Sequence, residues 1–151
     1  MNIDQKKFIE SATLAAKDAG HLFPEYAAAE AALESKFGTS QLCAKHNNLF
    51  GMKQHRKPVY ETVTIPTREW NGTEFVTVVA KWIKYPSWKE SFTDRMDTLK
   101  RLSDLYPLTY GAALDASNGE EFIQKVSKTW STDPKRADKV LKVLSTFKAS
   151  V

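Results

Sequence analysis

The chain has 151 residues, 42% of them hydrophobic, which is the composition of a folded chain with a core and excludes a disordered one. This length suits one domain that spans residues 1–151. The net charge of +4 favours acidic partners, but the basic residues are spread along the chain, which argues against nucleic acid as a partner.

The sequence contains no motif typical of a disulfide, a metal site or a membrane-inserted segment. Cys43 is the only cysteine, so no intrachain disulfide forms, and the three histidines fall in no metal-binding spacing. No run approaches ~18 apolar residues and the N-terminus has no apolar leader. We therefore expect no membrane insertion, and synthesis in the cytoplasm without a signal peptide; a domain excised from a longer protein would look the same.

The N-terminal part of the chain predicts two helices. Residues 4–20 carry apolar side chains at helical spacing, and Asn2 with Gln5 forms a capping pair at the start of this helix. The second helix begins at Pro24, continues through an alanine-rich run and is predicted to end at Gly38.

Residues 58–85 alternate between apolar and polar side chains, which indicates two strands. The dipeptide Asn71-Gly72 between the two runs predicts a hairpin with a two-residue turn, because both turn residues then need positive φ. Such a turn would place Trp70 opposite Thr73.

Helical spacing returns in the remainder of the chain. Capping patterns at Ser87 and at Ser117 or Asn118 predict two helix starts, and Asp133 before Pro134 predicts a third. The order of helices, hairpin and helices indicates an α+β fold with a helical lobe and a small β-hairpin lobe.

Glu34 is the first candidate for catalysis. It stands in the run "AALESKFG", among small apolar residues and near the end of a helix, although most helix glutamates are simply solvated. Burial and the negative end of the helix dipole would both raise the pKa of this carboxyl group. A carboxylic acid that is still protonated near neutral pH is what a general acid requires.

Glu69 is the candidate for a second carboxylate. It lies on the predicted hairpin, where it could be an edge-strand charge or could face Glu34 across a cleft. Two acidic groups on either side of a glycosidic bond are the usual requirement for sugar hydrolysis. The pattern alone does not select Glu69, because Glu61 and Glu74 lie in the same lobe.

The loop "NNLFGMK" has two equally weighted interpretations. Its asparagines could turn the backbone while Phe50 packs in the core. Alternatively, Asn48 could bind sugar hydroxyl or acetamido groups beside Phe50 as an aromatic platform.

These motifs together resemble the bacterial peptidoglycan glucosaminidases, the family of flagellar and autolysin-type N-acetylglucosaminidases. The segments "AALESKFGTSQL" and "NNLFGMK" are similar to the family's A-L-E-S-G-W-G and N-L-F-G-I-K. The likeness continues through "TREWNGTEF", "YPSWKESFTDR" and "WSTDPKRADKVL", the last similar to Y-A-T-D-P-x-Y-A-x-K-L. The resemblance covers nearly the whole chain in the same order and implies a lysozyme-like fold.

The resemblance also implies roles for single residues. Glu34 matches the family's general acid and Glu69 its hairpin carboxylate, while Asn48 and Phe50 match the loop that lines the cleft. Tyr85 falls in the segment after the hairpin, where cleft and core positions both occur.

Two departures from the family pattern bear on the site. Lys36-Phe37 replaces the usual Gly-Trp after the glutamate-serine pair. Trp130 replaces the tyrosine to which the family assigns a substrate-orienting or catalytic role, and a tryptophan has no acidic hydroxyl. Tyr110 is the candidate for supplying the missing phenol.

The resemblance implies a hydrolase that cleaves the β-1,4 bond from N-acetylglucosamine to N-acetylmuramic acid in the glycan strands of bacterial peptidoglycan. It implies no metal or organic cofactor, and we expect the chain to act as a monomer on the cell wall. Without a signal peptide or a wall-binding repeat, the chain resembles a phage or prophage lysis enzyme more than a secreted autolysin.

Three alternatives remain open from the sequence. The same fold could cleave the opposite bond, as a muramidase or lytic transglycosylase. The replacement of the family tyrosine by Trp130 makes a non-catalytic cell-wall-binding module conceivable. The positive charge is the one feature in favour of nucleic-acid binding.

Overall fold

The structure, a computed structural model, describes residues 1–55 and 60–151. The predicted strand residues 58 and 59 lie outside the described part. In chain order, the elements are α1 (Ile3–Asp18), α2 (Pro24–Ser35), α3 (Gln41–His46), β1 (Thr62–Trp70), β2 (Phe75–Ile83), α4 (Trp88–Leu105), a π-helical turn η1 (Pro107–Gly111), α5 (Ala112–Leu114), α6 (Gly119–Trp130) and α7 (Arg136–Ala149).

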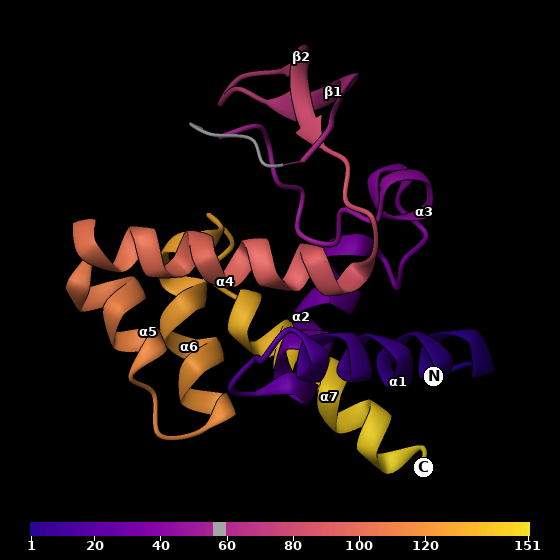
Figure 1. The fold of residues 1–151 in the computed structure, drawn as a ribbon, viewed down its shortest axis with the longest axis vertical. Helices are drawn as coiled ribbons and strands as arrows, with labels where there is room; N and C mark the ends of the chain where they lie inside the picture. Colours follow the sequence, from indigo (N-terminus) through magenta and orange to yellow (C-terminus); the bar gives the residue numbers. More distant parts are fainter. Residues whose placement is uncertain (56–59) are drawn as a thin grey trace.

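The helices form one body and the two strands project from it as a hairpin (Figure 1). Two clusters of buried apolar side chains fill the helical body, and both contact Trp130 and the apolar side of α7. The predicted α+β architecture, a helical lobe with a small β-hairpin lobe, is confirmed.

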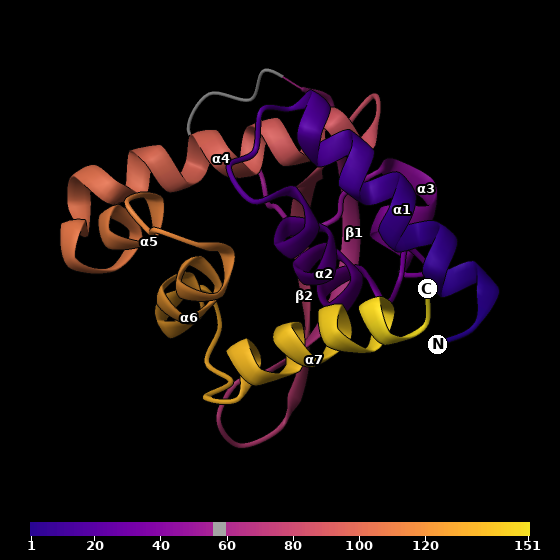
Figure 2. The same ribbon diagram turned by 90° about the horizontal axis from the view of Figure 1, so that it is seen from below.

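Helix α2 lies at the centre of the helical body, with α1, α4 and α7 around it (Figure 2). Every residue from position 27 to position 32 is buried, so the helix has no solvent-facing side in this stretch. Alanine makes this possible, because its small side chain lets neighbouring helices approach closely and favours the helix itself. Pro24 stands at the first helical position, as predicted.

Helix α2 ends at Ser35, three residues before the predicted end at Gly38. Lys36, Phe37 and Gly38 follow in left-handed conformation, with φ of 52°, 54° and 80°. Ser35 fixes this turn, because its hydroxyl donates to the Ala31 carbonyl at 2.6 Å and accepts from the Gly38 N–H at 2.9 Å. The chain therefore leaves α2 abruptly after Ser35, one residue beyond Glu34.

The predicted hairpin is present, but its predicted register is wrong. Trp70 pairs with Phe75 instead of Thr73, and a four-residue loop joins the strands. The Asn71 side chain explains the longer loop, because its Oδ1 accepts from the backbone N–H groups of Thr73 and Glu74, both at 2.9 Å. Strand β2 joins the helical body at its last residues, where Trp82 and Ile83 are buried.

The predicted helix starts hold for α4 and α6, and the third is displaced. Ser87 is the N-cap of α4, although its hydroxyl bonds the Glu90 side chain and not the backbone. Asn118 caps α6 by accepting from Glu121 N at 2.8 Å. Helix α7 begins at Arg136, because Asp133 closes a turn by accepting from Lys135 N at 2.9 Å.

Candidate active site

A groove of ≈ 730 Å³ lies where the helical body meets the base of the hairpin. It brings together four of the predicted site residues, Glu34, Phe50, Tyr110 and Trp130, which come from four different segments of the chain. Lining residues that the sequence interpretation did not single out include Lys53, His55, Trp82 and Arg101.

Glu34 reaches the groove from the last turn of α2. Its side chain is 26% exposed, and its Oε1 accepts from Nε of Arg136 at 3.0 Å. The sequence interpretation placed only small apolar residues around Glu34 and did not include this guanidinium. Among the described residues, no hydrogen bond is made to the second carboxylate oxygen, Oε2, which is therefore the oxygen available to a ligand.

Arg136 is 1% exposed and uses each nitrogen of its guanidinium group. Besides the bond to Glu34, Nη1 donates to Oγ of Ser127 at 2.8 Å and Nη2 donates to Oε2 of Glu30 at 2.7 Å. Such multiple charged bonds fix a side chain firmly. Arg136 stands where the T-D-P-x-Y part of the family motif has a tyrosine.

Glu30 lies one turn before Glu34 and is completely buried. It accepts two parallel bonds from Arg95, at 2.6 and 2.8 Å, in addition to the one from Arg136. Burial opposes ionisation, but the attraction and hydrogen bonds of the two arginines outweigh it and lower the pKa of Glu30 to about 2. The carboxylate is thus an ionised anchor behind the groove.

The guanidinium of Arg95 lies between two aromatic rings that line the groove. Its central carbon lies 4.6 Å from the ring centroid of Phe50 and 4.5 Å from that of Trp130. These distances are those of cation–π contacts. Arg95 therefore links the buried Glu30 to the aromatic floor of the groove.

Two predicted substrate-binding residues, Asn48 and Tyr85, are buried and are not among the residues that line the groove. The Asn48 amide is buried and bonds the backbone: Nδ2 donates to the carbonyls of Met52 and Ile83, and Oδ1 accepts from Met52 N. Its side chain therefore holds the loop in shape and has no group left for a sugar. Tyr85 takes the core position of the two that the sequence allowed.

The hydroxyl of Tyr85 donates to Oδ2 of Asp94 at 2.5 Å, and burial together with this carboxylate raises the pKa of the phenol. Nε2 of His55, a groove residue, lies 3.1 Å from the same oxygen. Asp94 thus fixes His55 against α4. Sequence offered no signal for this contact, because His55 and Asp94 are 39 positions apart.

Glu69 lies on β1, outside the groove lining, with 41% of its side chain exposed. Its Oε1 accepts from Nζ of Lys53 at 3.1 Å. Lys53 itself lines the groove, forms a β-bridge with Trp82 and holds its ammonium group 5.2 Å from the Trp82 ring centroid. Glu69 is therefore connected through Lys53 to the groove that Glu34 lines.

No group of three or more His, Cys, Asp or Glu side chains in residues 1–55 and 60–151 could hold a metal ion. Over the same residues, none of the helices combines the length and the apolar character needed to cross a membrane.

Comparison with known proteins supports the family suggested by the motifs. Residues 10–149 match the family model Glucosaminidase, described as mannosyl-glycoprotein endo-beta-N-acetylglucosaminidase. The exo-glucosaminidase LytG of Bacillus subtilis is 32% identical over 148 residues, which are 95% of this chain and 52% of LytG. A probable N-acetylmuramidase of Lactococcus lactis is 30% identical over 93% of this chain and 33% of its own length. The chain thus spans about half or less of the length of these relatives.

Solved structures of similar proteins support the same family. The catalytic domain of the autolysin Auto from Listeria monocytogenes superposes with a TM-score of 0.84 at 29% identity, over 98% of this chain and 86% of that one. A glycoside hydrolase domain of FlgJ from Salmonella typhimurium gives a TM-score of 0.74 at 27% identity, over 96% and 98% of the two chains. The family model, the relatives and the structures lead to one conclusion: the chain belongs to the glucosaminidase family.

Proposed function

We propose that this chain, acting as one domain over residues 1–151, hydrolyses β-1,4 glycosidic bonds in the glycan strands of bacterial peptidoglycan, with Glu34 as the general acid. The observation that carries the proposal is the groove in which the Glu34 carboxylate meets the aromatic side chains of Phe50, Tyr110 and Trp130. Aromatic rings bury the apolar faces of sugars, and the carboxylic acid protonates the leaving oxygen.

The contacts of Glu34 suit this role. Arg136 holds Oε1, so the side chain is fixed in direction while Oε2 is left for the proton and the glycosidic oxygen. A polysaccharide that fills the groove removes water from around Glu34. General acid catalysis of this kind contributes about 10²–10⁴-fold to a rate.

The second half of the reaction has two routes. Glu69 activates a water molecule on the far face of the sugar, which requires that Glu69 leave Lys53. In the other route, the acetamido oxygen of the substrate takes the place of water and attacks the sugar carbon of the cleaved bond. Glu69 then stabilises the positive charge of the resulting intermediate. In both routes the proton comes from Glu34.

The bond from N-acetylglucosamine to N-acetylmuramic acid is the proposed target, because the family and LytG are both named for glucosaminidase activity. The N-acetylmuramidase name of the lactococcal relative keeps the opposite bond as the second candidate. The proposed place of action is the cell wall, where we expect the chain to act as a monomer.

Mass spectrometry of purified peptidoglycan after digestion tests the proposal. We expect fragments with N-acetylglucosamine at the reducing end, and their loss in Glu34→Gln. Fragments that end in reducing or anhydro N-acetylmuramic acid would show a muramidase or a transglycosylase. Wild-type protein that binds cell walls and releases no fragments would show a binding module instead.

A further inference from the structure

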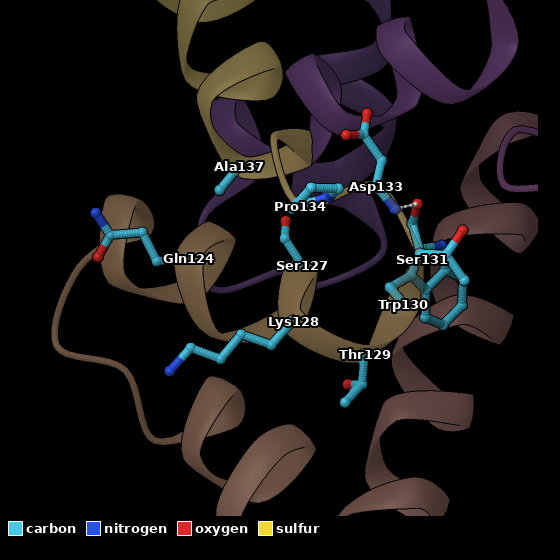
Figure 3. A pocket seen from close by; sticks show the side chains of 10 residues that line it. Gln124, Ser127, Lys128, Thr129, Trp130, Ser131, Asp133, Pro134 and Ala137 are labelled. Atoms are coloured by element: carbon cyan, nitrogen blue, oxygen red, sulfur yellow. Dashed lines mark hydrogen bonds between the residues drawn. The ribbon is translucent and has the colours of Figure 1, made fainter.

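A second hollow, of ≈ 770 Å³, lies at the junction of α6 and α7 (Figure 3). The last two turns of α6, the connecting segment 131–134 and the first turn of α7 form its walls. Trp130 lines this hollow and also lines the groove that holds Glu34. One aromatic side chain therefore separates two concave sites, and a ligand that passes Trp130 could occupy both.

The walls of the hollow combine apolar and polar side chains. The polar ones include Thr129 and Ser131, which carry hydroxyl groups, Gln124, which carries an amide, and Lys128, which carries an ammonium group. Oγ of Ser131 already accepts from the backbone N–H of Asp133 at 3.1 Å, which shapes the connecting segment (Figure 3). Side chains of this kind bind a polar chain with carbonyl, amide and carboxylate groups.

The charge of the hollow is positive. Asp133, its one acidic lining residue, is neutralised by Lys139, whose Nζ lies 2.5 Å from Oδ2. Lys128 is exposed, and it forms no ion pair with any described residue. Its ammonium group is thus available to a carboxylate of a ligand.

We propose that this hollow binds the acidic peptide branch of the peptidoglycan strand, so that the enzyme recognises the branch as well as the sugars. The inference rests on the proposed function and deepens it. The peptide leaves the glycan chain sideways from the lactyl group of a muramic acid, so it needs a site beside the groove. Trp130 marks the place where chain and branch separate, and Lys128 pairs with a carboxylate of the peptide.

Binding measured by calorimetry tests the proposal without turnover. Protein with Glu34→Gln is titrated with two soluble ligands, glycan strands that carry the peptide and strands stripped of it by an amidase. We expect tighter binding of the peptide-bearing strands. Lys128→Ala lowers this preference about threefold, which is what a single exposed ion pair contributes. Lys128→Glu lowers it further, because the carboxylates then repel each other.

Two more variants make the test specific. Gln124 lies one helical turn before Lys128 on α6 and lines the same hollow, so Gln124→Lys in the Lys128→Ala protein should restore the preference. Lys17→Ala, which removes an exposed lysine from α1, should leave it unchanged. Equal binding of the two ligands, or a preference that no Lys128 variant alters, would overturn the inference. Failure of the wild-type protein to cleave strands that it binds with this preference would refute the proposed hydrolase and leave the inference standing.

Discussion

Arg136 on α7 and Glu34 on α2 are 102 positions apart, and a bond of 3.0 Å from Nε to Oε1 joins them. The same guanidinium is bonded to the fully buried Glu30. The carboxylate proposed as the general acid is thus fixed to the most deeply buried charge of the helical body, and its direction depends on that charge.

Arg136→Lys tests this dependence. A lysine keeps the charge but cannot form three bonds in fixed directions. We expect kcat to fall about 10²-fold with KM little changed, because a misplaced acid slows the chemical step more than binding. Steady-state kinetics on soluble glycan strands measure both constants. Glu25→Gln, which breaks only the exposed pair with Lys148, is the control and should leave kcat unchanged. A selective rise in KM would contradict the positioning role.

Glu69→Gln tests the second carboxylate. If Glu69 activates water or stabilises the positive charge, kcat falls about 10²-fold or more. Folding should be unaffected, since the exposed pair with Lys53 contributes at most about 1 kcal/mol. Turnover and thermal unfolding are measured side by side, with Glu74→Gln in the hairpin loop as the matched control. Activity that stays at the wild-type level would leave the acetamido group of the substrate as the sole nucleophilic partner.

Glu30 makes folding sensitive to acid. Its pKa is lowered from 4.5 in the unfolded chain to about 2 in the folded one, so the unfolded chain binds the proton first. The stabilisation is therefore complete above about pH 4.5 and is lost as the pH falls toward 2, by about 3 kcal/mol in total. Glu30→Gln should remove this pH dependence from the free energy of unfolding in urea. Glu25→Gln, in an exposed pair with Lys148, should retain it.

His21 makes the folding stability depend on pH in a higher range than Glu30 does. Burial, and then the charge of Arg95, lower its pKa from 6.5 to about 4, so the folded protein disfavours the imidazolium. Stability from this group is complete above about pH 6.5 and is lost as the pH falls through 4. In His21→Gln the free energy of unfolding should change less with pH between 6.5 and 4 than in the wild type. An unchanged slope in this window would show that the imidazole is already charged in the folded protein.

Lys36→Gly should stabilise the protein. Lys36 caps α2 in left-handed conformation, with φ 52° and ψ 52°, which costs a residue with a side chain about 1 kcal/mol more than glycine. We expect the Tm to rise by about 3 °C in a calorimetric scan. Phe37→Gly should lower it, although Phe37 also has positive φ, because its ring packs edge-on against Phe8 with the centroids 6.1 Å apart. A lower Tm for Lys36→Gly would mean that its side chain contributes packing.

Much of the fold could be predicted because its signals are local. The cap pair Asn2 and Gln5 forms a complete capping box, and the Asn71-Gly72 turn lies where the hairpin was expected. The register was wrong because the Asn71 side chain bonds two backbone donors of its own loop, a choice that the dipeptide does not encode.

The surroundings of the candidate site were harder to predict. Glu34 was proposed as a site residue from its alanine-rich context, but its partner Arg136 lies on another helix and sequence spacing gives no hint of the contact. Asn48 was assigned to the sugar because asparagines in a loop can face either a ligand or the backbone, and only the structure shows that both ends of its amide are used.

The ion cluster of Glu30, Arg95 and Arg136 ties α2, α4 and α7 together behind the aromatic floor of the groove. A change in any one member leaves the charges of the others without their partner in the interior. Single substitutions at these positions are therefore poorly tolerated. Trp130 and Arg136 both stand where the family motif has a tyrosine, so this chain departs from the family pattern within the floor itself. We therefore expect a homologue that carries the arginine to need the buried acid at position 30 as its partner.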